Sequence, residues 1–253
     1  MEPVVILSRQ EQEYLLRVIE SGLRVDSLGQ FFLWTQGQLQ ALLPHQMLVC
    51  MRFAPGGSLL RLECVHGTVL PPSALALLSA ARDGLASRIG RHCLQGGRLP
   101  AMADFASEAG QGVLECFRAE LDRAGFDSVL VHGTGQTPDG ASVFALFGLP
   151  MRPNGRHAYF LELLLPHLHL ALMRLPDAAS RAFGAAFARP LSTREAEIMA
   201  WLREGKSNDE VGQILGISAL TVKNHLQRIY RLLGVSNRAH ALARCMELRL
   251  IEG

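Results

Sequence analysis

The residues of this chain with the clearest chemical potential lie in the segment 218–233, which has the length of a four-turn helix. At helical spacing, one side of it is apolar and contains Val222, Leu226, Ile229 and Leu233. The remaining positions carry Thr221, Lys223, Asn224, Gln227, Arg228 and Arg231, with no carboxylate among them. A helix face that only keeps a protein soluble usually mixes both signs of charge. Cations and amides alone suit the phosphates and base edges of a nucleic acid.

The sequence gives less support to metal binding, nucleotide binding or catalysis. His167 and His169 are two positions apart, so on a helix their side chains diverge, whereas a pair of metal ligands would stand three or four positions apart. The glycine-containing stretch Gly133–Gly135 is not followed by the Gly-Lys-Ser/Thr of a phosphate-binding loop, and the chain has no G-x-S-x-G nucleophile motif. We therefore expect no enzyme activity, no metal and no cofactor.

The five cysteines, at positions 50, 64, 93, 116 and 245, are widely spaced, and no CxxC pair occurs. This pattern favours reduced thiols packed as small apolar side chains in a cytoplasmic protein. No signal peptide is visible at the N-terminus. The most apolar stretch, 158–175, contains Glu162, Pro166 and Arg174, which indicates a buried helix and not a membrane span.

The charge of the chain is unevenly distributed. Overall, 25 Lys and Arg face 23 Asp and Glu, a net charge of +2. Residues 189–253 hold an excess of three positive charges and residues 1–188 an excess of one negative charge. This mild basic excess at the C-terminal end is what we expect if that end meets phosphates, although charge alone does not decide the matter.

The elements that position the 218–233 segment are four short helices with clear boundaries. Ser192 and Glu195 have capping-box spacing, as do Ser207 and Glu210, so a helix should begin at each serine. Glycines at 205, 216 and 234 follow the predicted helices and are typical stop signals. The connector at 216–218 is so short that the helices on either side must cross steeply, which predicts a helix-turn-helix. A fourth helix is expected over 237–250.

The segment 191–251 resembles the LuxR/FixJ-type, or GerE-type, DNA-binding domain. The resemblance rests on several elements at matching mutual spacing, namely Leu191–Glu195 (LSTRE), Gly205–Asn208 (GKSN), Leu215–Ser218 (LGIS), Thr221–His225 (TVKNH) and Leu233–Arg238 (LGVSNR). It covers about a quarter of the chain. It implies that residues 218–233 form a recognition helix in the major groove of duplex DNA.

The resemblance also assigns roles to residues. Lys223, Asn224, Gln227 and Arg228 should reach base edges or flanking phosphates, and Arg231 a phosphate. Phosphates should also be contacted, or contacts to them organised, by Arg194, Ser207, Asn208, Thr221 and Arg238. His225 lies between these faces and is expected to be a structural hydrogen-bonding residue. The fourth helix should form a dimer contact through Ala241, Leu242 and Cys245.

The first 175 residues show a different pattern. Helices are expected from Ser8 to Gly22 and over 26–43, followed by a hairpin of strands at 47–54 and 59–66. Further helices are expected over 71–89, 111–124 and 158–175, with strands at 128–132 and 141–149. The fold class is therefore an α+β N-terminal domain with an antiparallel sheet and helices, joined to an all-α four-helix domain. We expect domains at 1–175 and 191–253 with a linker over 176–190.

Three kinds of input domain compete for residues 1–175. A phosphorylated receiver is excluded, because its chemistry needs a lysine beside clustered aspartates and the first 205 residues contain no lysine. An acyl-homoserine-lactone sensor remains an alternative, although its pattern of pocket aromatics cannot be placed here. A GAF-like or PAS-like domain for dimerisation, with or without a ligand, is preferred. The stretches 31–40 (FFLWTQGQLQ), 43–45 (LPH) and 163–168 (LLLPHL) are similar to EpsA-type regulators, which are associated with exopolysaccharide and exosortase gene clusters.

The sequence thus predicts a cytoplasmic, homodimeric regulator of transcription that binds double-stranded DNA, with exopolysaccharide genes as its targets. One alternative is a ligand-gated, quorum-sensing-like regulator with a small-molecule effector in a pocket of residues 1–175, whose lining residues are unknown. Another, from a different class, is an enzyme or metal protein with an appended helix-turn-helix. An enclosed pocket with convergent polar groups would favour the first alternative.

Overall fold

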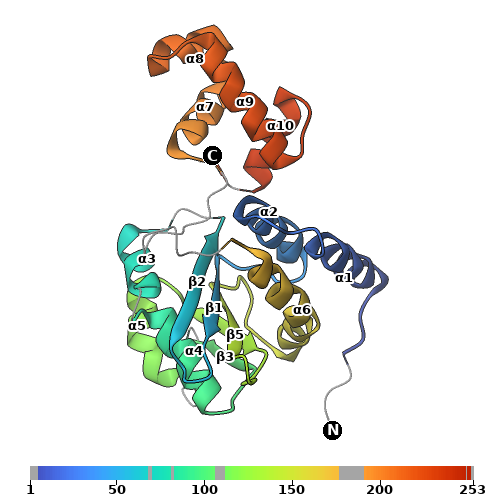
Figure 1. The fold of residues 1–253 in the computed structure, drawn as a ribbon, viewed down its shortest axis with the longest axis vertical. Coiled ribbons are helices and arrows are strands. Elements are labelled where there is room, and N and C mark those ends of the chain that lie inside the picture. The colour runs from blue at the N-terminus through green and yellow to red at the C-terminus, as the bar shows by residue number, and fades with distance from the viewer. Residues whose placement is uncertain are drawn as a thin grey trace.

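The computed structural model describes residues 5–67, 70–80, 83–105, 112–176, 191–248 and 250–251. Figure 1 shows an N-terminal part built on a sheet and a C-terminal part made only of helices. The predicted linker 176–190 lies outside the described residues except for Pro176. An antiparallel sheet with helices followed by a helical C-terminal domain confirms the expected fold class.

The sheet has five strands in the order β2-β1-β5-β4-β3, and every neighbouring pair is antiparallel. The strands are β1 (Met47–Phe53), β2 (Leu59–His66), β3 (Ala101–Asp104), β4 (Ser128–Gly133) and β5 (Ala141–Phe147). The predicted hairpin β1–β2 is present, and the two later predicted strands pair as β4–β5. They join through β1 and β5, in a register that runs from Met47 opposite Phe147 to Phe53 opposite Ala141.

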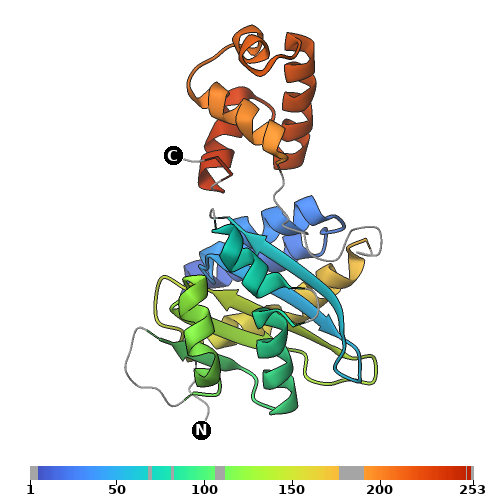
Figure 2. The same cartoon turned by 90° about the vertical axis from the view of Figure 1, so that its left-hand side faces the viewer.

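Helices cover both faces of the sheet, as Figure 2 shows from the side. Alternate residues of β1 point to opposite faces, so Leu48 and Cys50 pack in one hydrophobic cluster and Val49 and Met51 in the other. The first cluster includes residues of α1 (Arg9–Gly22), α2 (Leu28–Leu33) and α6 (Gly155–Arg174). The second includes residues of α3 (Pro72–Ser79), α4 (Leu85–Gln95) and α5 (Arg118–Ala124). The N-terminal part therefore has three layers.

Three predicted helices of this part are interrupted in the structure. The segment expected to be helical over 26–43 is α2 followed by a π-helical turn, η1 (Trp34–Gln38), and a 3-10 turn, η2 (Leu39–Ala41). The segment 71–89 is split into α3 and α4 because Ala80, after the end of α3, and Gly84, before the start of α4, both have non-helical backbone angles. A 3-10 turn, η3 (Glu115–Phe117), precedes α5. Apolar periodicity alone does not show such breaks, because it changes little when a turn is wound more tightly or more loosely.

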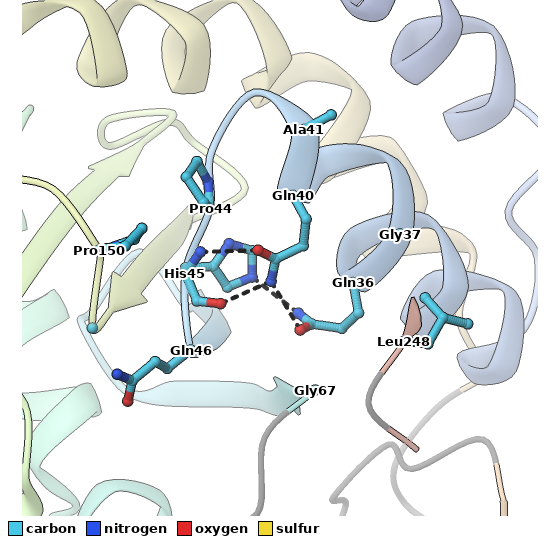
Figure 3. Close-up of a pocket in the computed structure, with 11 residues that line it drawn as sticks. Gln36, Gly37, Gln40, Ala41, Pro44, His45, Gln46, Gly67, Pro150 and Leu248 are labelled. Carbon is cyan, nitrogen blue, oxygen red and sulfur yellow. Dashed lines mark hydrogen bonds between the residues drawn. The ribbon is translucent and has the colours of Figure 1, made fainter. Parts of the chain in front are cut away.

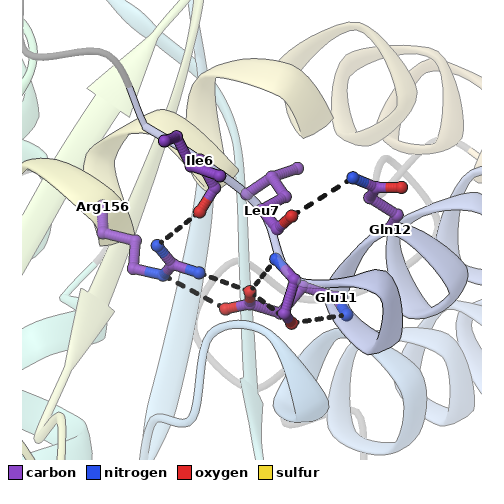
Figure 4. Close-up of polar contacts among 6 residues, drawn as sticks. Ile6, Leu7, Glu11, Gln12 and Arg156 are labelled. Atoms are coloured by element: carbon purple, nitrogen blue, oxygen red, sulfur yellow. Dashed lines mark hydrogen bonds and ion pairs between the residues drawn. The ribbon is translucent and has the colours of Figure 1, made fainter.

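Arg156 of α6 fastens the first helix to the domain (Figure 4). Its Nε donates to Oε1 of Glu11 at 3.1 Å, its Nη2 pairs with Oε2, and its Nη1 donates to the carbonyl of Ile6 at 3.1 Å. The same Glu11 carboxylate accepts from Ser8 N at 2.8 Å and closes a capping box at the predicted start of α1. The hydrogen bond from Arg156, followed by those from Ser8, lowers the pKa of Glu11 to about 2.

Arg61 of β2 fixes the end of α6, from which the chain continues toward the C-terminal part. Its Nη1 donates to the carbonyl of Leu175 at 2.9 Å, and its Nη2 to that of Pro176 at 2.7 Å. Its Nε lies 3.0 Å from the buried carboxylate of Glu63. A charged donor thus satisfies carbonyls that a helix end leaves without intrahelical partners.

The C-terminal part contains α7 (Thr193–Arg203), α8 (Asn208–Leu215), α9 (Ala219–Leu233) and α10 (Arg238–Glu247). It lies beside α2 (Figures 1 and 2), and its buried apolar residues belong to the same hydrophobic cluster as those of α2 and α6. A Cβ added at Gly29 of α2 would lie 2.8 Å from Cδ1 of Leu232, and one added at Gly37 would lie 3.2 Å from Nη2 of Arg244. Glycines therefore permit a close approach of the two parts.

Candidate nucleic-acid interface

Helices α8 and α9 form a tight helix-turn-helix. The α8 helix starts with the capping box of Ser207 and Glu210, and it ends at Gly216, whose φ of +66° is left-handed. Ser218 caps α9 by accepting from Thr221 N at 3.0 Å. Sequence reasoning missed Gly212: a Cβ there would lie 2.7 Å from the carbonyl oxygen of Ile217. Only a glycine lets the turn fold back onto α8 at this distance.

Helix α9 has the two faces that its sequence predicts. Its buried residues are Val222, Leu226, Ile229 and Leu233. Its exposed polar residues are Lys223, Asn224, Gln227, Arg228 and Arg231. These five follow the spacing of one helical surface, so they stand together as a polar stripe about two and a half turns long. We call these five residues the α9 stripe.

Glu195 connects the first helix of this domain to α9. Its Oε2 accepts from Ser192 N at 2.9 Å and from Ser192 Oγ at 2.8 Å, which closes the capping box of α7. Its Oε1 lies 3.4 Å from Nε of Arg228 and 4.0 Å from Nδ1 of His225. Helix α9 has no acidic residue of its own. It packs instead against the carboxylate of Glu195, whose side chain is 2% exposed. The sequence indicated the capping role and gave no sign of the contact with α9.

Two of the predicted phosphate-binding arginines are held inside the domain. Arg194 pairs with Glu197 at 2.8 Å through Nη1 and donates through Nη2 to the carbonyl of Leu215 at the end of α8. The Nη2 of Arg238 donates to the carbonyl of Leu202, in the last turn of α7, at 2.9 Å and to that of Lys206, in the connection to α8, at 2.8 Å. Both cations therefore bind backbone carbonyls where α7 connects to α8 and where α8 ends.

The remaining predicted phosphate contacts lie at helix N-termini. Ser207 is exposed and caps α8, and Asn208 is the first residue of that helix. Thr221 stands in the first turn of α9, where its Oγ1 lies 2.8 Å from Oγ of Ser218. The N–H groups of a first helical turn point outward and attract anions. These three residues thus occupy positions suited to phosphate oxygens.

The structure corrects the expectation for two residues of α10. Ala241 and Cys245 are both 0% exposed, so their side chains pack into the chain's own core and are not available to a second copy. Burial also raises the pKa of the Cys245 thiol to about 12. Leu242 is partly buried, and Ala239, Ala243 and Met246 are exposed. Helical spacing puts these last four residues on one face of α10.

Metal and thiol chemistry finds no further support in the described part of the chain. Among those residues, no group of three or more His, Cys, Asp or Glu could hold a metal ion. His169 accepts or donates a hydrogen bond to Ser142 Oγ at 2.8 Å, a contact between α6 and β5. Cysteines 50, 64, 93 and 245 are buried and Cys116 is exposed, all as free thiols. No described helix is long and apolar enough to cross a bilayer.

Residues 189–244 match the family model of the bacterial regulatory proteins of the luxR family, also called GerE. The C-terminal helical domain is of the luxR type. This finding confirms the resemblance drawn from the motifs of 191–251.

Curated relatives agree over the same region. The chain is 49% identical over 53 residues to the putative regulator YhjB of Escherichia coli K12, covering 21% of this chain and 26% of that protein. It is 36% identical over 104 residues to the transcriptional activator CarR of Pectobacterium carotovorum, covering 37% of this chain and 40% of CarR. Both are named as transcriptional regulators, not enzymes. The matches thus span between about a quarter and two fifths of these relatives.

Among solved structures, the match to Escherichia coli SdiA covers 96% of this chain and 99% of the SdiA chain, at 17% identity and a TM-score of 0.47. A likeness at this level carries no argument about ligand or partner.

Proposed function

We propose that the chain is a transcriptional regulator that binds duplex DNA as a homodimer, with α9 in the major groove. The observation that carries this proposal is the α9 stripe, which presents three cations and two amides from one exposed helical surface. The major groove admits a single α-helix, and its base edges offer acceptors and donors to such side chains. The match of residues 189–244 to the luxR family supports the same function.

The stripe divides naturally into residues that read bases and residues that bind the backbone. Asn224 and Gln227 have amides that can pair with the N6 and N7 atoms of adenine, and Lys223 and Arg228 can donate to guanine. Arg231 lies toward the C-terminal end of the stripe, where we assign it to phosphate. Ser207, Asn208 and Thr221, at the starts of α8 and α9, would hold the phosphates on either side.

A dimer follows from the small size of one such module. A single helix-turn-helix buries too little surface for useful affinity, so two half-sites are needed. We assign the contact to the exposed apolar face of α10, formed by Ala239, Leu242, Ala243 and Met246. Met246 is 56% exposed and is the most exposed large apolar side chain of this face. This assignment replaces Ala241 and Cys245 and keeps Leu242.

The dimer contact can be tested by sedimentation. Met246→Glu should shift the full chain from dimer toward monomer, because it places a charge in an apolar contact. Met151→Glu is the matched control, since Met151 is 64% exposed and lies in the N-terminal part. If both variants sediment like the unchanged protein, the α10 contact is wrong, whereas DNA binding through α9 would be unaffected by that result.

We further propose that the protein acts in the cytoplasm and that its targets include genes for exopolysaccharide synthesis. The proposed binding to DNA supports the cytoplasmic location. The similarity of 31–40 and 163–168 to EpsA-type regulators supports the target genes. Purified full-length protein should be incubated with fragments of the source genome, and the bound fragments sequenced. Enrichment of promoters next to exopolysaccharide genes is the expected result. Enrichment of other promoters would contradict the proposed target genes. No enrichment at all would contradict the proposed recognition of DNA.

A further inference from the structure

A pocket lies where the N-terminal part meets the end of α10 (Figure 3). Its volume of about 480 Å³ is within the usual range for small-molecule sites. Most of its lining comes from the η1–η2 turns and the segment that leads into β1, and Leu248 comes from the C-terminal part. The lining residues are Gln36, Gly37, Gln40, Ala41, Pro44, His45, Gln46, Gly67, Gly148, Pro150 and Leu248.

His45 stands at the polar side of this pocket in a fixed tautomer. Its Nδ1 lies 2.6 Å from the carbonyl oxygen of Leu43, which can only accept, so Nδ1 carries the hydrogen. Its Nε2 lies 2.9 Å from Nε2 of Gln36 and therefore accepts from that amide. Burial lowers the pKa of His45 to about 4, so the ring is neutral at neutral pH.

Gln40 locks the same cluster from the next helical turn. Its Nε2 donates to Oε1 of Gln36 at 3.1 Å and to the carbonyl of His45 at 2.8 Å. Its Oε1 accepts from His45 N at 3.0 Å. These bonds hold Gln36 in one orientation and leave its second amide hydrogen and a second lone pair on its oxygen for another molecule. A preorganised polar edge of this kind loses little entropy when a ligand binds.

The chemistry of the lining selects a class of occupant. Three glutamines, one neutral histidine and backbone groups provide the polar atoms of the described lining, and none of these described residues is charged. Pro44, Pro150, Ala41 and Leu248 add apolar surface. An ion would find no counter-charge among the described lining residues themselves, although the cation of Arg244 lies beside Gly37, whereas a neutral ligand needs none. A sugar ring fits, because it offers hydroxyl donors and acceptors at its edge and C–H groups on its faces.

The pocket also touches the surface on which the two parts of the chain meet. A Cβ added at Gly67, at the end of β2, would lie 3.1 Å from Oε1 of Gln36 and 3.4 Å from the carbonyl oxygen of Leu248. Arg244 and Leu232 approach Gly37 and Gly29 on the same side of the N-terminal part. An occupant against Gln36 and Leu248 would therefore contact both parts at once.

We propose that this pocket is an effector site for an uncharged, polyhydroxylated small molecule of sugar size, and that its occupation alters how the luxR-type domain rests on the N-terminal part. The second half rests on the proposed function, because the effect would be read as a change in DNA affinity. The first half does not depend on it.

Binding is tested on the full chain without DNA. A panel of neutral mono- and disaccharides and polyols, with glucose 6-phosphate and glucuronate as charged counterparts, is screened by saturation-transfer NMR and followed by calorimetry. At least one neutral probe should bind, and each charged counterpart should bind at least about tenfold more weakly. If no neutral probe binds, or if charged probes bind equally well, the site assignment is overturned.

Two variants separate the pocket from the rest of the surface. Ala41→Phe fills the pocket from its exposed rim without touching the hydrogen bonds of His45, and Gln36→Leu removes the polar edge. Both should weaken binding of the neutral probe by about tenfold or more, while the exposed Gln10→Leu of α1 should leave it unchanged. Binding that survives both pocket variants would contradict the proposal. Ala41→Phe keeps the test valid if Gln36→Leu folds poorly.

Coupling is then measured as DNA affinity with and without the bound probe. A change of at least about fivefold, absent in Ala41→Phe, is expected for an effector. If the sugar binds and DNA affinity stays the same, the coupling is rejected and the pocket stands. If no duplex binds under any condition, the proposed function fails, and the binding result still decides the site.

Discussion

The Nε of Arg228 lies 3.4 Å from Oε1 of Glu195, on a carboxylate that is 2% exposed, while the Arg228 side chain itself is 70% exposed. The pair thus has one buried and one exposed end. The buried carboxylate also caps α7 through Ser192, so the orientation of α9 depends on the same group that begins the domain. An arginine held at its Nε keeps both terminal nitrogens free to point outward.

Replacing Glu195 should separate its two contacts. Glu195→Gln keeps an oxygen for the Ser192 cap and removes the charge that faces α9, so we expect a small loss of stability. Glu195→Ala also removes the bonds from Ser192 N and Oγ to the carboxylate, while Ser192 Oγ still accepts from the backbone N of residue 195, and this adds about 1 kcal/mol. Thermal melting of the helical signal measures both. The exposed Glu20→Gln of α1 is the control, and a Glu195→Ala melting temperature equal to that of the control would contradict this account.

Gly212 offers a test of the tight turn. Gly212→Ala should destabilise the C-terminal domain by about 1–3 kcal/mol, because its new methyl would lie 2.7 Å from the backbone oxygen of Ile217. Gly155→Ala at the start of α6 meets nothing within 4 Å and should be neutral or slightly stabilising. Urea unfolding followed by circular dichroism compares the two. Equal midpoints would mean that α8 and α9 are not packed as closely as described.

Arg231 tests the assignment to phosphate. Arg231→Ala should weaken binding to all duplexes alike and reduce the slope of log affinity against log salt by roughly one unit, because one fewer counterion is released. Fluorescence anisotropy over a salt series provides the slope. Arg17→Ala in α1, whose side chain is 64% exposed, should leave the slope unchanged. An unchanged slope in Arg231→Ala would remove this residue from the interface.

His45 predicts a pH dependence of stability. Above pH 6.5 its ring is neutral in both the folded and the unfolded chain. As the pH falls from 6.5 toward 4, the unfolded chain binds a proton that the folded chain does not, so the free energy of unfolding decreases. By pH 5 the loss from this group is about 2 kcal/mol. Burial lowers the pKa of His132, His157 and His169 in the same direction.

The contribution of His45 is isolated by substitution. His45→Asn should reduce the difference in unfolding free energy between pH 7.5 and pH 5 by about 2 kcal/mol, and the exposed His92→Asn should not. Glu11, whose pKa is lowered to about 2, loses its stabilising effect only below the pH where the unfolded glutamate takes up a proton. A His45→Asn variant with the full wild-type difference would show that His45 is not buried in its neutral form.

Local signals in the sequence predicted the parts of this structure that depend on near neighbours. The capping boxes of Ser8, Ser192 and Ser207 are all present, and Gly216 and Gly234 end their helices with left-handed backbone angles. These features follow from hydrogen bonds within a few residues. The exposed polar stripe of α9 follows from helical periodicity in the same way.

Features that depend on contacts between distant residues could not be predicted from the sequence. The pairing of β1 with β5, the contact of Glu195 with Arg228 and the engagement of Arg238 with the carbonyl of Leu202 each join segments far apart in the chain. The burial of Ala241 and Cys245 was missed for a related reason. An apolar helix face looks the same in sequence whether it packs against its own domain or against a second copy.

The claim on which the account depends is that the α9 stripe reads bases. The most direct measurement is selection from a random duplex library with the full-length protein and with Asn224→Ala and Gln227→Ala, using Gln10→Ala as the control. Each α9 variant should relax the preference at one base position of the selected half-site, at about 1–3 kcal/mol per lost contact, and keep the rest. Selected sequences that are identical for all four proteins would contradict the placement of α9 in the major groove.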